Sequence, residues 1–103
     1  MLTKKIIRGK LYNTETAEYL GSYMYGAPSD FRYTEEYLYR KKTGEYFLAG
    51  SGGPLSKYRK DCRPNGWGWG SEIIPMSLEA AKDWVEEYLD AEEYIDIFGE
   101  PEE

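Results

Sequence analysis

The segment YTEEYLYRKKTGEYFLA, residues 33–49, has the pattern of two strands joined by a tight turn, and the rest of the fold can be built from it. Side chains alternate along its first half, so one side carries Tyr33, Glu35, Tyr37 and Tyr39 and the other carries Thr34, Glu36, Leu38 and Arg40. A repeat of two is the signature of a β-strand. Residues 41–44 supply a turn that ends in glycine, and residues 45–49 return as a second strand. This segment therefore predicts an antiparallel hairpin.

The flanking segments extend this hairpin into a sheet. Residues 5–13 predict one strand, and residues 72–76 predict a short strand that Pro75 stops. Residues 17–25 fit two structures: alternating tyrosines favour a strand, whereas Thr16 as an N-cap and Gly21 as a C-terminal glycine favour a helix over 16–21. Between these segments, residues 50–71 hold six glycines and two prolines, which predicts a long irregular loop of functional interest.

The C-terminal third carries a helical pattern. Ser77 is the predicted N-cap of a helix over residues 78–89. Its apolar face holds Leu78, Ala81, Trp84, Val85, Tyr88 and Leu89, and its opposite face holds Glu79, Asp83, Glu86, Glu87 and Asp90. Asp90 and Glu93 then predict a capping box for a second, short helix that ends at Gly99.

Together these elements predict an α+β fold, in which a small antiparallel sheet of about four strands is covered by a C-terminal amphipathic helix. We expect a single domain over residues 1–99 and a frayed acidic tail over residues 100–103. Tyrosine accounts for 11 of the 17 aromatic residues. Because its ring is apolar and its hydroxyl is polar, tyrosine suits half-buried strands and contact surfaces.

The charge is divided between the two parts of the chain. Residues 1–71 carry 12 Lys and Arg and 7 Asp and Glu, a net charge of +5, whereas residues 72–103 carry 1 Lys and 12 Asp and Glu, a net charge of −11. Such asymmetry bears on binding partners rather than on the fold. It predicts either a nucleic acid bound by the basic front or a nucleic-acid-binding protein bound by the acidic tail.

The composition argues against enzymatic chemistry. The chain has no histidine and one cysteine, Cys62, so the usual nucleophile–base sets and transition-metal sites are missing, and we expect no enzyme activity, no cofactor and no metal. A single cysteine cannot form an internal disulfide, which fits a reducing compartment. The sequence has no apolar run of membrane-spanning length and no signal-peptide pattern, so we expect a cytoplasmic protein without membrane contact.

Two sets of residues are candidate binding sites. The first is a partner-binding set that combines the acidic helix face with two aromatic anchors: Glu79, Asp83, Glu86, Glu87, Asp90, Trp67 and Trp69. The second is a basic set for nucleic acid, with the tyrosine rows 19, 23, 25 and 33, 37, 39 as a stacking platform: Lys57, Tyr58, Arg59, Lys60 and Arg63. Each also has a plain structural interpretation, as a solvated helix face or as tyrosines lining a sheet.

A series of short segments adds a resemblance. The segments are YNTETA at 12–17, LG at 20–21, SDF at 29–31, EYLYR at 36–40, GEYFL at 44–48, GSGGP at 50–54, IP at 74–75 and EAAKDW at 79–84. In this order, over residues 10–98, the chain resembles a family of small proteins from phages, plasmids and conjugative elements of Gram-positive bacteria. The resemblance implies an accessory protein of a mobile genetic element in a bacterial host cell, and it carries over no catalytic residues.

Some proteins of this kind are similar to anti-CRISPR proteins that act on type II systems, that is, on Cas9. We therefore expect an inhibitor that binds a Cas nuclease, Cas9 with its guide RNA, and blocks the loading or cleavage of target DNA without catalysis. The acidic face would act as a nucleic-acid mimic. The alternatives are a module that binds single-stranded DNA or RNA through the basic front and an inhibitor of another bacterial defence protein. The run at residues 57–60 is more basic than the family pattern, which keeps the nucleic-acid alternative open.

Overall fold

The predicted hairpin forms the middle of a four-stranded antiparallel sheet in the computed structural model, which describes residues 2–103. The strand order is β3 (Glu18–Tyr25), β4 (Thr34–Arg40), β5 (Tyr46–Gly52) and β8 (Gly70–Met76). Two small hairpins, β1 (Lys4–Ile7) with β2 (Lys10–Asn13) and β6 (Lys60–Asp61) with β7 (Trp67–Gly68), lie outside it. The chain closes with α1 (Leu78–Tyr88) and α2 (Ala91–Phe98). The α+β prediction is confirmed.

The register of the central hairpin places its two faces as the alternation predicts. Leu38 lies opposite Leu48 and Tyr39 lies opposite Phe47, so the aliphatic pair faces one side of the sheet and the aromatic pair faces the other. At the turn, Gly44 has a φ of +94° and its N–H donates to the carbonyl of Lys41 at 2.9 Å. Glycine adopts this backbone conformation without steric cost.

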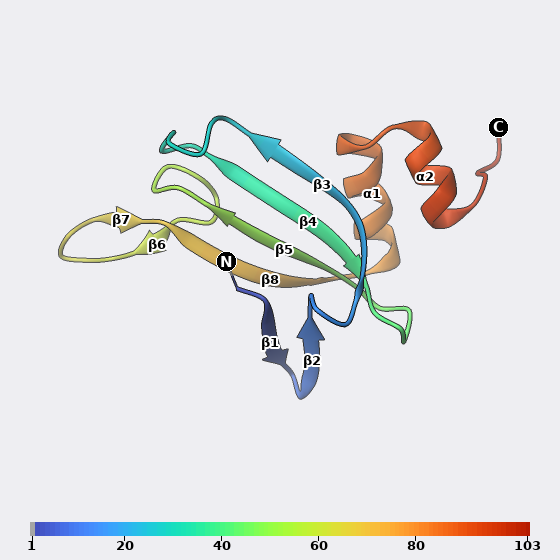
Figure 1. The fold of residues 1–103 in the computed structure, drawn as a ribbon, viewed down its shortest axis with the longest axis horizontal. Coiled ribbons are helices and arrows are strands. Elements are labelled where there is room, and N and C mark those ends of the chain that lie inside the picture. The colour runs from blue at the N-terminus through green and yellow to red at the C-terminus, as the bar shows by residue number, and fades with distance from the viewer. Residues whose placement is uncertain (1) are drawn as a thin grey trace.

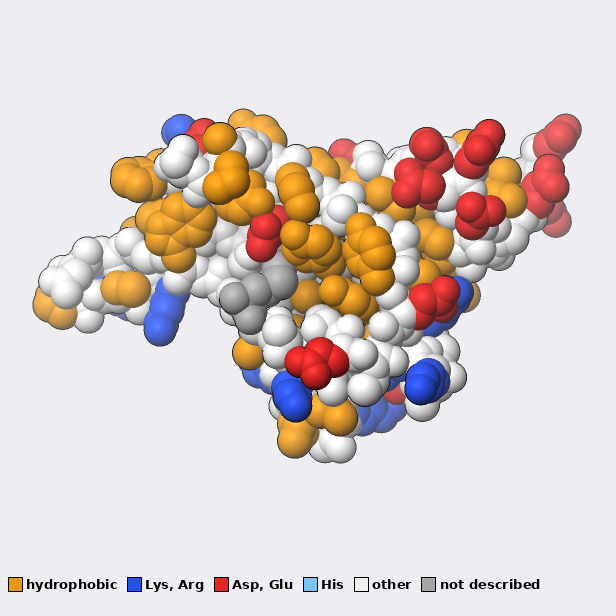
Figure 2. Space-filling model, in the orientation of Figure 1, with side chains coloured by type: hydrophobic (Ala, Val, Ile, Leu, Met, Phe, Trp, Pro, Cys, Tyr) orange, Lys and Arg blue, Asp and Glu red, His pale blue; other side chains and the backbone are white. Residues whose placement is uncertain are grey.

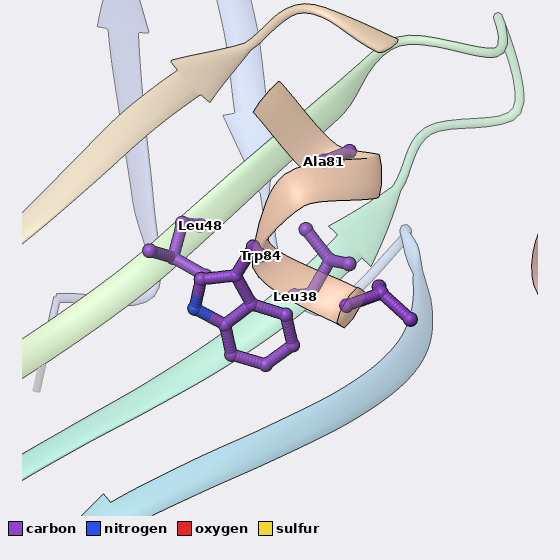
Figure 3. Packing of buried hydrophobic residues seen from close by; sticks show 5 residues of the cluster. Leu38, Leu48, Ala81 and Trp84 are labelled. Atoms are coloured by element: carbon purple, nitrogen blue, oxygen red, sulfur yellow. The ribbon is translucent and has the colours of Figure 1, made fainter. Parts of the chain in front are cut away.

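The sheet has a hydrophobic cluster on each face. On one face, α1 packs its Ala81, Trp84 and Val85 onto Leu38 and Leu48 (Figure 3). On the other, the β1–β2 hairpin covers one part of the sheet, and the buried residues there are Tyr12, Phe47, Ala49 and Ile73. The helices lie at one end of the molecule and the β6–β7 hairpin lies at the other (Figure 1), along a longest dimension of 50 Å.

Both helix starts are as predicted. The Ser77 hydroxyl accepts from the Ala80 N–H at 3.0 Å, which gives a partner to one of the N–H donors that the first turn of α1 leaves without one. At α2, the Asp90 carboxylate accepts from the Glu93 N–H at 2.8 Å, and the Glu93 side chain accepts from the Asp90 N–H at 3.4 Å. This capping box separates the two helices, and Gly99 ends the second with a φ of +88°.

The prediction of one strand over residues 5–13 is wrong, because the chain reverses within it. Arg8 and Gly9 both have positive φ, at +52° and +78°, and they form a two-residue turn that pairs Ile7 with Lys10. Turns of this kind usually carry Asn-Gly or Asp-Gly. Because arginine occupies the first position here, the sequence does not show the usual pattern of such a turn.

Residues 17–25 form a strand, so the helical alternative is wrong. The pairing with β4 shifts at Leu20, where the register passes from Tyr19 opposite Tyr39 to Gly21 opposite Leu38. This β-bulge inserts an extra residue and changes which side chains share a face. Tyr19 consequently lies on the face away from α1, while Tyr23 lies on the helix side with Glu36. The predicted tyrosine row 19, 23, 25 is therefore split between the two faces.

The long loop over residues 50–71 contains more regular structure than predicted. β5 runs on to Gly52, β8 starts at Gly70, and the β6–β7 hairpin lies between them. β8 also continues past Pro75, which an edge strand of a sheet tolerates. At Gly50, a Cβ atom would overlap the ring of Tyr58, so glycine there lets the loop fold back onto the sheet.

Candidate functional site

Glu36 is the most deeply buried charged group of the described chain. It lies on β4 facing α1, with none of its surface exposed, and three side chains surround its carboxylate. The indole N–H of Trp84 donates to Oε1 at 3.0 Å, the Tyr58 hydroxyl donates to Oε2 at 2.5 Å, and the Lys57 ammonium lies 2.7 Å from Oε2. These contacts join the sheet, the glycine-rich loop and α1 at one point.

The electrostatics of this network favour an ionised glutamate. Burial acts to raise the pKa of Glu36, but the hydrogen bonds from Lys57, Tyr58 and Trp84 outweigh it and hold the pKa below its usual value. Burial, followed by the hydrogen bond to Glu36, raises the pKa of Tyr58. All three partners of Glu36 belong to this chain, and Glu36 has no exposed surface for a ligand to contact. Its role is therefore to stabilise the fold and not to bind a ligand.

The five acidic residues predicted on the helix lie on the molecular surface. We call them, with the exposed carboxylates of α2, the acidic helical surface: Glu79, Asp83, Glu86, Glu87, Asp90, Glu92, Glu93 and Asp96. No ion pair formed within residues 2–103 involves any of them. Figure 2 shows the red carboxylates gathered at the helical end of the molecule. Lys82, the single cation of this part of the chain, is half-buried, with its ammonium 5.9 Å from the centre of the Phe98 ring.

A shallow groove of about 480 Å³ accompanies this surface. Its lining is mainly apolar, from Leu89, Tyr94 and Ile95, and it also includes the carboxylate-bearing Glu86 and Asp90. The acidic helical surface thus offers apolar contact area beside its charges.

The two tryptophans predicted as anchors lie away from the acidic helical surface. Trp67 is in β7 and Trp69 follows it, at the end of the molecule opposite the helices (Figure 1). The guanidinium of Arg59 sits over the Trp67 ring at 4.6 Å, and Trp69 lies 6.4 Å from the ring of Tyr33. The predicted partner-binding set is therefore two separate surfaces.

The basic set is only partly available to a ligand. Tyr58 is 5% exposed, so its ring offers no face on which a base could stack. Lys57 is paired with Glu36, and the Arg63 guanidinium lies 2.6 Å from Asp61. Of the predicted basic set, Arg59 and Lys60 therefore remain as exposed cations that form no ion pair within residues 2–103.

The sheet face away from α1 carries a group that the sequence interpretation treated only as a strand residue. Glu35 lies in the tyrosine row of β4, and its carboxylate accepts from the Tyr33 hydroxyl at 2.7 Å, the Ser51 hydroxyl at 2.9 Å and the Tyr37 hydroxyl at 3.5 Å. The hydrogen bond to Glu35, followed by burial, raises the pKa of Tyr33 to about 12. The alternation of residues 33–40 predicted that Glu35 lies among tyrosines. It could not predict the contact with Ser51, because Ser51 belongs to the neighbouring strand β5.

Within residues 2–103, no group of three or more acidic, cysteine or histidine side chains has the arrangement of a metal site. Over the same residues, neither helix has the length and apolar character needed to cross a membrane. Comparisons with protein-family models, with curated proteins and with solved structures find no match to this chain.

Proposed function

We propose that this protein is a non-catalytic inhibitor that binds a Cas nuclease, Cas9 with its guide RNA, and blocks the loading or cleavage of target DNA. The observation that carries the proposal is the acidic helical surface, whose carboxylates have no cationic partner within residues 2–103. The resemblance to mobile-element proteins supplies the class of partner. A protein channel that binds nucleic acid is positively charged, so it is complementary to such a surface.

The spacing of the charges supports mimicry of a nucleic acid. Glu79, Asp83, Glu86 and Glu87 lie within nine residues of α1, and the eight steps from the first to the last cover about 12 Å at 1.5 Å per residue. That spacing gives one negative charge about every 4 Å along the helix axis, close to the 3.4 Å per phosphate along one strand of B-form DNA. The helix is held rigidly, because Ala81, Trp84 and Val85 are buried on its other side.

The groove beside the charges adds what a nucleic acid lacks. Leu89, Tyr94 and Ile95 offer apolar area next to Glu86 and Asp90. Contact with this area excludes water and strengthens binding beyond charge attraction alone. An inhibitor with both features competes with DNA for a basic channel and is less sensitive to salt than DNA itself.

The test is a capture experiment with the purified protein against Cas9 alone, Cas9 with guide RNA, and a labelled single-stranded oligonucleotide, at low and moderate salt. We expect capture by Cas9 loaded with guide RNA, loss of DNA cleavage, and no oligonucleotide binding. The decisive variant is the triple substitution Asp83→Lys, Glu86→Lys and Glu87→Lys, which spares the capping residue Asp90. Its matched control is Glu100→Lys, Glu102→Lys and Glu103→Lys, which changes the net charge equally. Inhibition that survives the first triple contradicts the docking mechanism.

A second function has one observation in its favour. Arg59 is stacked on Trp67, which is 51% exposed, and Lys60 lies next to Arg59 in the chain. An aromatic ring with cations beside it is the arrangement that binds single-stranded nucleic acid. This alternative predicts salt-sensitive binding of an oligonucleotide that is lost in the double variant Arg59→Ala, Lys60→Ala. Absence of binding at low salt removes it. If the protein inhibits a different bacterial defence protein, neither Cas9 alone nor Cas9 with guide RNA captures it, and this result distinguishes that alternative from the main proposal.

A further inference from the structure

The face of the sheet away from α1 is covered at one end only. The β1–β2 hairpin packs over Phe47, Ala49 and Ile73, and the part of β4 that includes Glu35 lies beyond them. Across the sheet, Glu35 is flanked by Met24 of β3 and Ser51 of β5. The surrounding surface, which we call the tyrosine face, is made of Tyr19, Met24, Tyr33, Glu35, Tyr37 and Trp69.

This face is apolar and accessible around one charge. Met24, Tyr19 and Trp69 are each about half exposed, at 53%, 54% and 47%. Figure 2 shows hydrophobic side chains spread over the middle of the sheet on this side. Exposed aromatic and methionine side chains gathered in one place are typical of a surface that contacts another protein.

The carboxylate of Glu35 is oriented but not neutralised. Its donors are three hydroxyl groups, and no cation within residues 2–103 forms an ion pair with it. Glu36, the next residue in the chain, faces the opposite side of the sheet. Its carboxylate accepts hydrogen bonds from Tyr58 and Trp84 and also pairs with the Lys57 ammonium. A protein that docks on the tyrosine face removes water from Glu35, and burying a carboxylate without a cation is costly. A complementary partner therefore brings the cation with it.

The rings around Glu35 select the kind of cation. Aromatic faces attract positive charge, and a planar guanidinium stacks on a ring while it donates hydrogen bonds to a carboxylate. The ammonium of lysine is more strongly hydrated and does not stack. Phosphate groups are repelled by the carboxylate, which argues against the use of this face as a base-stacking platform for nucleic acid.

We propose that the tyrosine face is a protein-docking surface on which Glu35 and the surrounding rings receive an arginine side chain of the partner. Three hydroxyls hold the carboxylate in place before binding, so little side-chain freedom is lost when the arginine arrives. The site lies on the face of the sheet opposite α1 and does not use the acidic helical surface. It therefore stands independently of the proposal about Cas9.

The experiment uses the whole protein and a blocked amino acid as the probe. N-acetyl-arginine amide is titrated into isotope-labelled protein, and the NMR signals of Tyr33, Tyr37 and Ser51 are followed, with N-acetyl-lysine amide and N-acetyl-citrulline amide as comparisons. We expect saturable shifts confined to the tyrosine face, strongest for the arginine probe. Glu35→Gln keeps an acceptor oxygen and removes the charge, and we expect it to weaken binding about tenfold.

Two further variants keep the test decisive if Glu35→Gln disturbs the sheet. Glu72→Gln removes an exposed carboxylate from the opposite face, beside Gly50, and it is expected to bind arginine as the unmodified protein does. Trp69→Leu removes a ring and leaves the hydrogen bonds of Glu35 untouched, and it is expected to weaken binding several-fold. Equal shifts with the neutral citrulline probe, shifts that map to α1 and α2 instead, or unchanged affinity in both Glu35→Gln and Trp69→Leu overturn the proposal.

Discussion

Glu36 and Trp84 are 48 positions apart in the chain, and the indole N–H of Trp84 donates to the Glu36 carboxylate at 3.0 Å. One residue belongs to the middle of the sheet and the other to the buried side of α1. The hydrogen bond therefore fixes the helix in position on the strands. The acidic helical surface lies on the other side of the same helix, so the geometry of the proposed binding surface depends on a contact in the interior.

We expect Trp84→Phe to destabilise the protein by about 1–3 kcal/mol, because the buried Glu36 carboxylate loses the N–H that donates to Oε1, while Tyr58 and Lys57 both contact Oε2. Phenylalanine keeps an aromatic ring among Leu38, Leu48 and Val85, so the loss reports mainly on the hydrogen bond. Urea denaturation measures the free energy of unfolding. The control is Trp67→Phe at an exposed position, where we expect a change within about 0.5 kcal/mol. Equal urea midpoints for the two variants contradict the role assigned to Trp84.

The same network predicts a dependence of stability on acidic pH. The folded-state pKa of Glu36 is lower than its unfolded value, so folding favours the ionised carboxylate. This contribution is fully present above the unfolded pKa of about 4.3. It is lost as the pH falls through the lower, folded-state pKa.

Urea denaturation at pH 7 and at pH 3 checks the sign of this effect. Between these two values, we expect the free energy of unfolding to fall less in Glu36→Gln than in the unmodified protein. Glu45→Gln is the matched control, since the pKa of Glu45 is also lowered, by its hydrogen bond to Lys10, but at the surface. A solvent-exposed pair contributes little to stability, so Glu45→Gln should follow the unmodified protein. A Glu36→Gln profile parallel to the unmodified one rules out the mechanism.

Local patterns predicted the central hairpin and the helix starts, because these depend on residues close in sequence. The alternation over residues 33–40 placed Glu35 and Glu36 on opposite faces, and Ser77 and Asp90 capped their helices as expected. The β-bulge at Leu20 was missed, because an extra residue in one strand is visible only against the partner strand. As a result, the tyrosine row 19, 23, 25 was assigned to one face.

Two of the three partners of Glu36, Lys57 and Tyr58, were missed for a related reason. Lys57 and Tyr58 lie in a loop whose path depends on the glycines at 50 and 52, so their basic and aromatic character was interpreted as a surface feature. One signal was available in the sequence. A tryptophan on the buried face of a helix needs an acceptor for its N–H, and Glu36 lies on the inward side of the strand together with Leu38. That pairing points to a buried glutamate bonded to Trp84, but it does not identify the other two partners, Lys57 and Tyr58.

We expect Gly50→Ala to destabilise the protein by about 1–3 kcal/mol, because the added Cβ overlaps the ring of Tyr58. Tyr58 is buried between the loop and the sheet, so it has little room to move aside. Tyr58→Phe measures the contribution of the hydroxyl alone, since it keeps the ring and removes only the hydrogen bond to Glu36.

A double variant tests whether packing is the cause. If it is, Gly50→Ala combined with Tyr58→Ala lowers the free energy of unfolding by less than the sum of the two single variants. Additive losses in urea denaturation indicate that the close approach at Gly50 is not what limits the substitution.

Tyrosine titration provides a direct check on the charge at the centre of the tyrosine face. The pKa of Tyr33 is raised to about 12 by its hydrogen bond to Glu35, whereas a free tyrosine titrates near 10. Because the raised pKa favours the neutral phenol in the folded state, the associated stability is present below pH 10 and is lost as the pH rises through 12.

Absorbance at 295 nm follows the ionisation of the tyrosines. We expect the Glu35→Gln variant to ionise more tyrosine between pH 10 and pH 11 than the unmodified protein. Tyr33→Phe should remove most of that difference but not all of it, because burial and then the charge of Glu35 also raise the pKa of Tyr37. Identical titration curves for Glu35→Gln and the unmodified protein show that no charged carboxylate acts on Tyr33, which also removes the charge on which the arginine site depends.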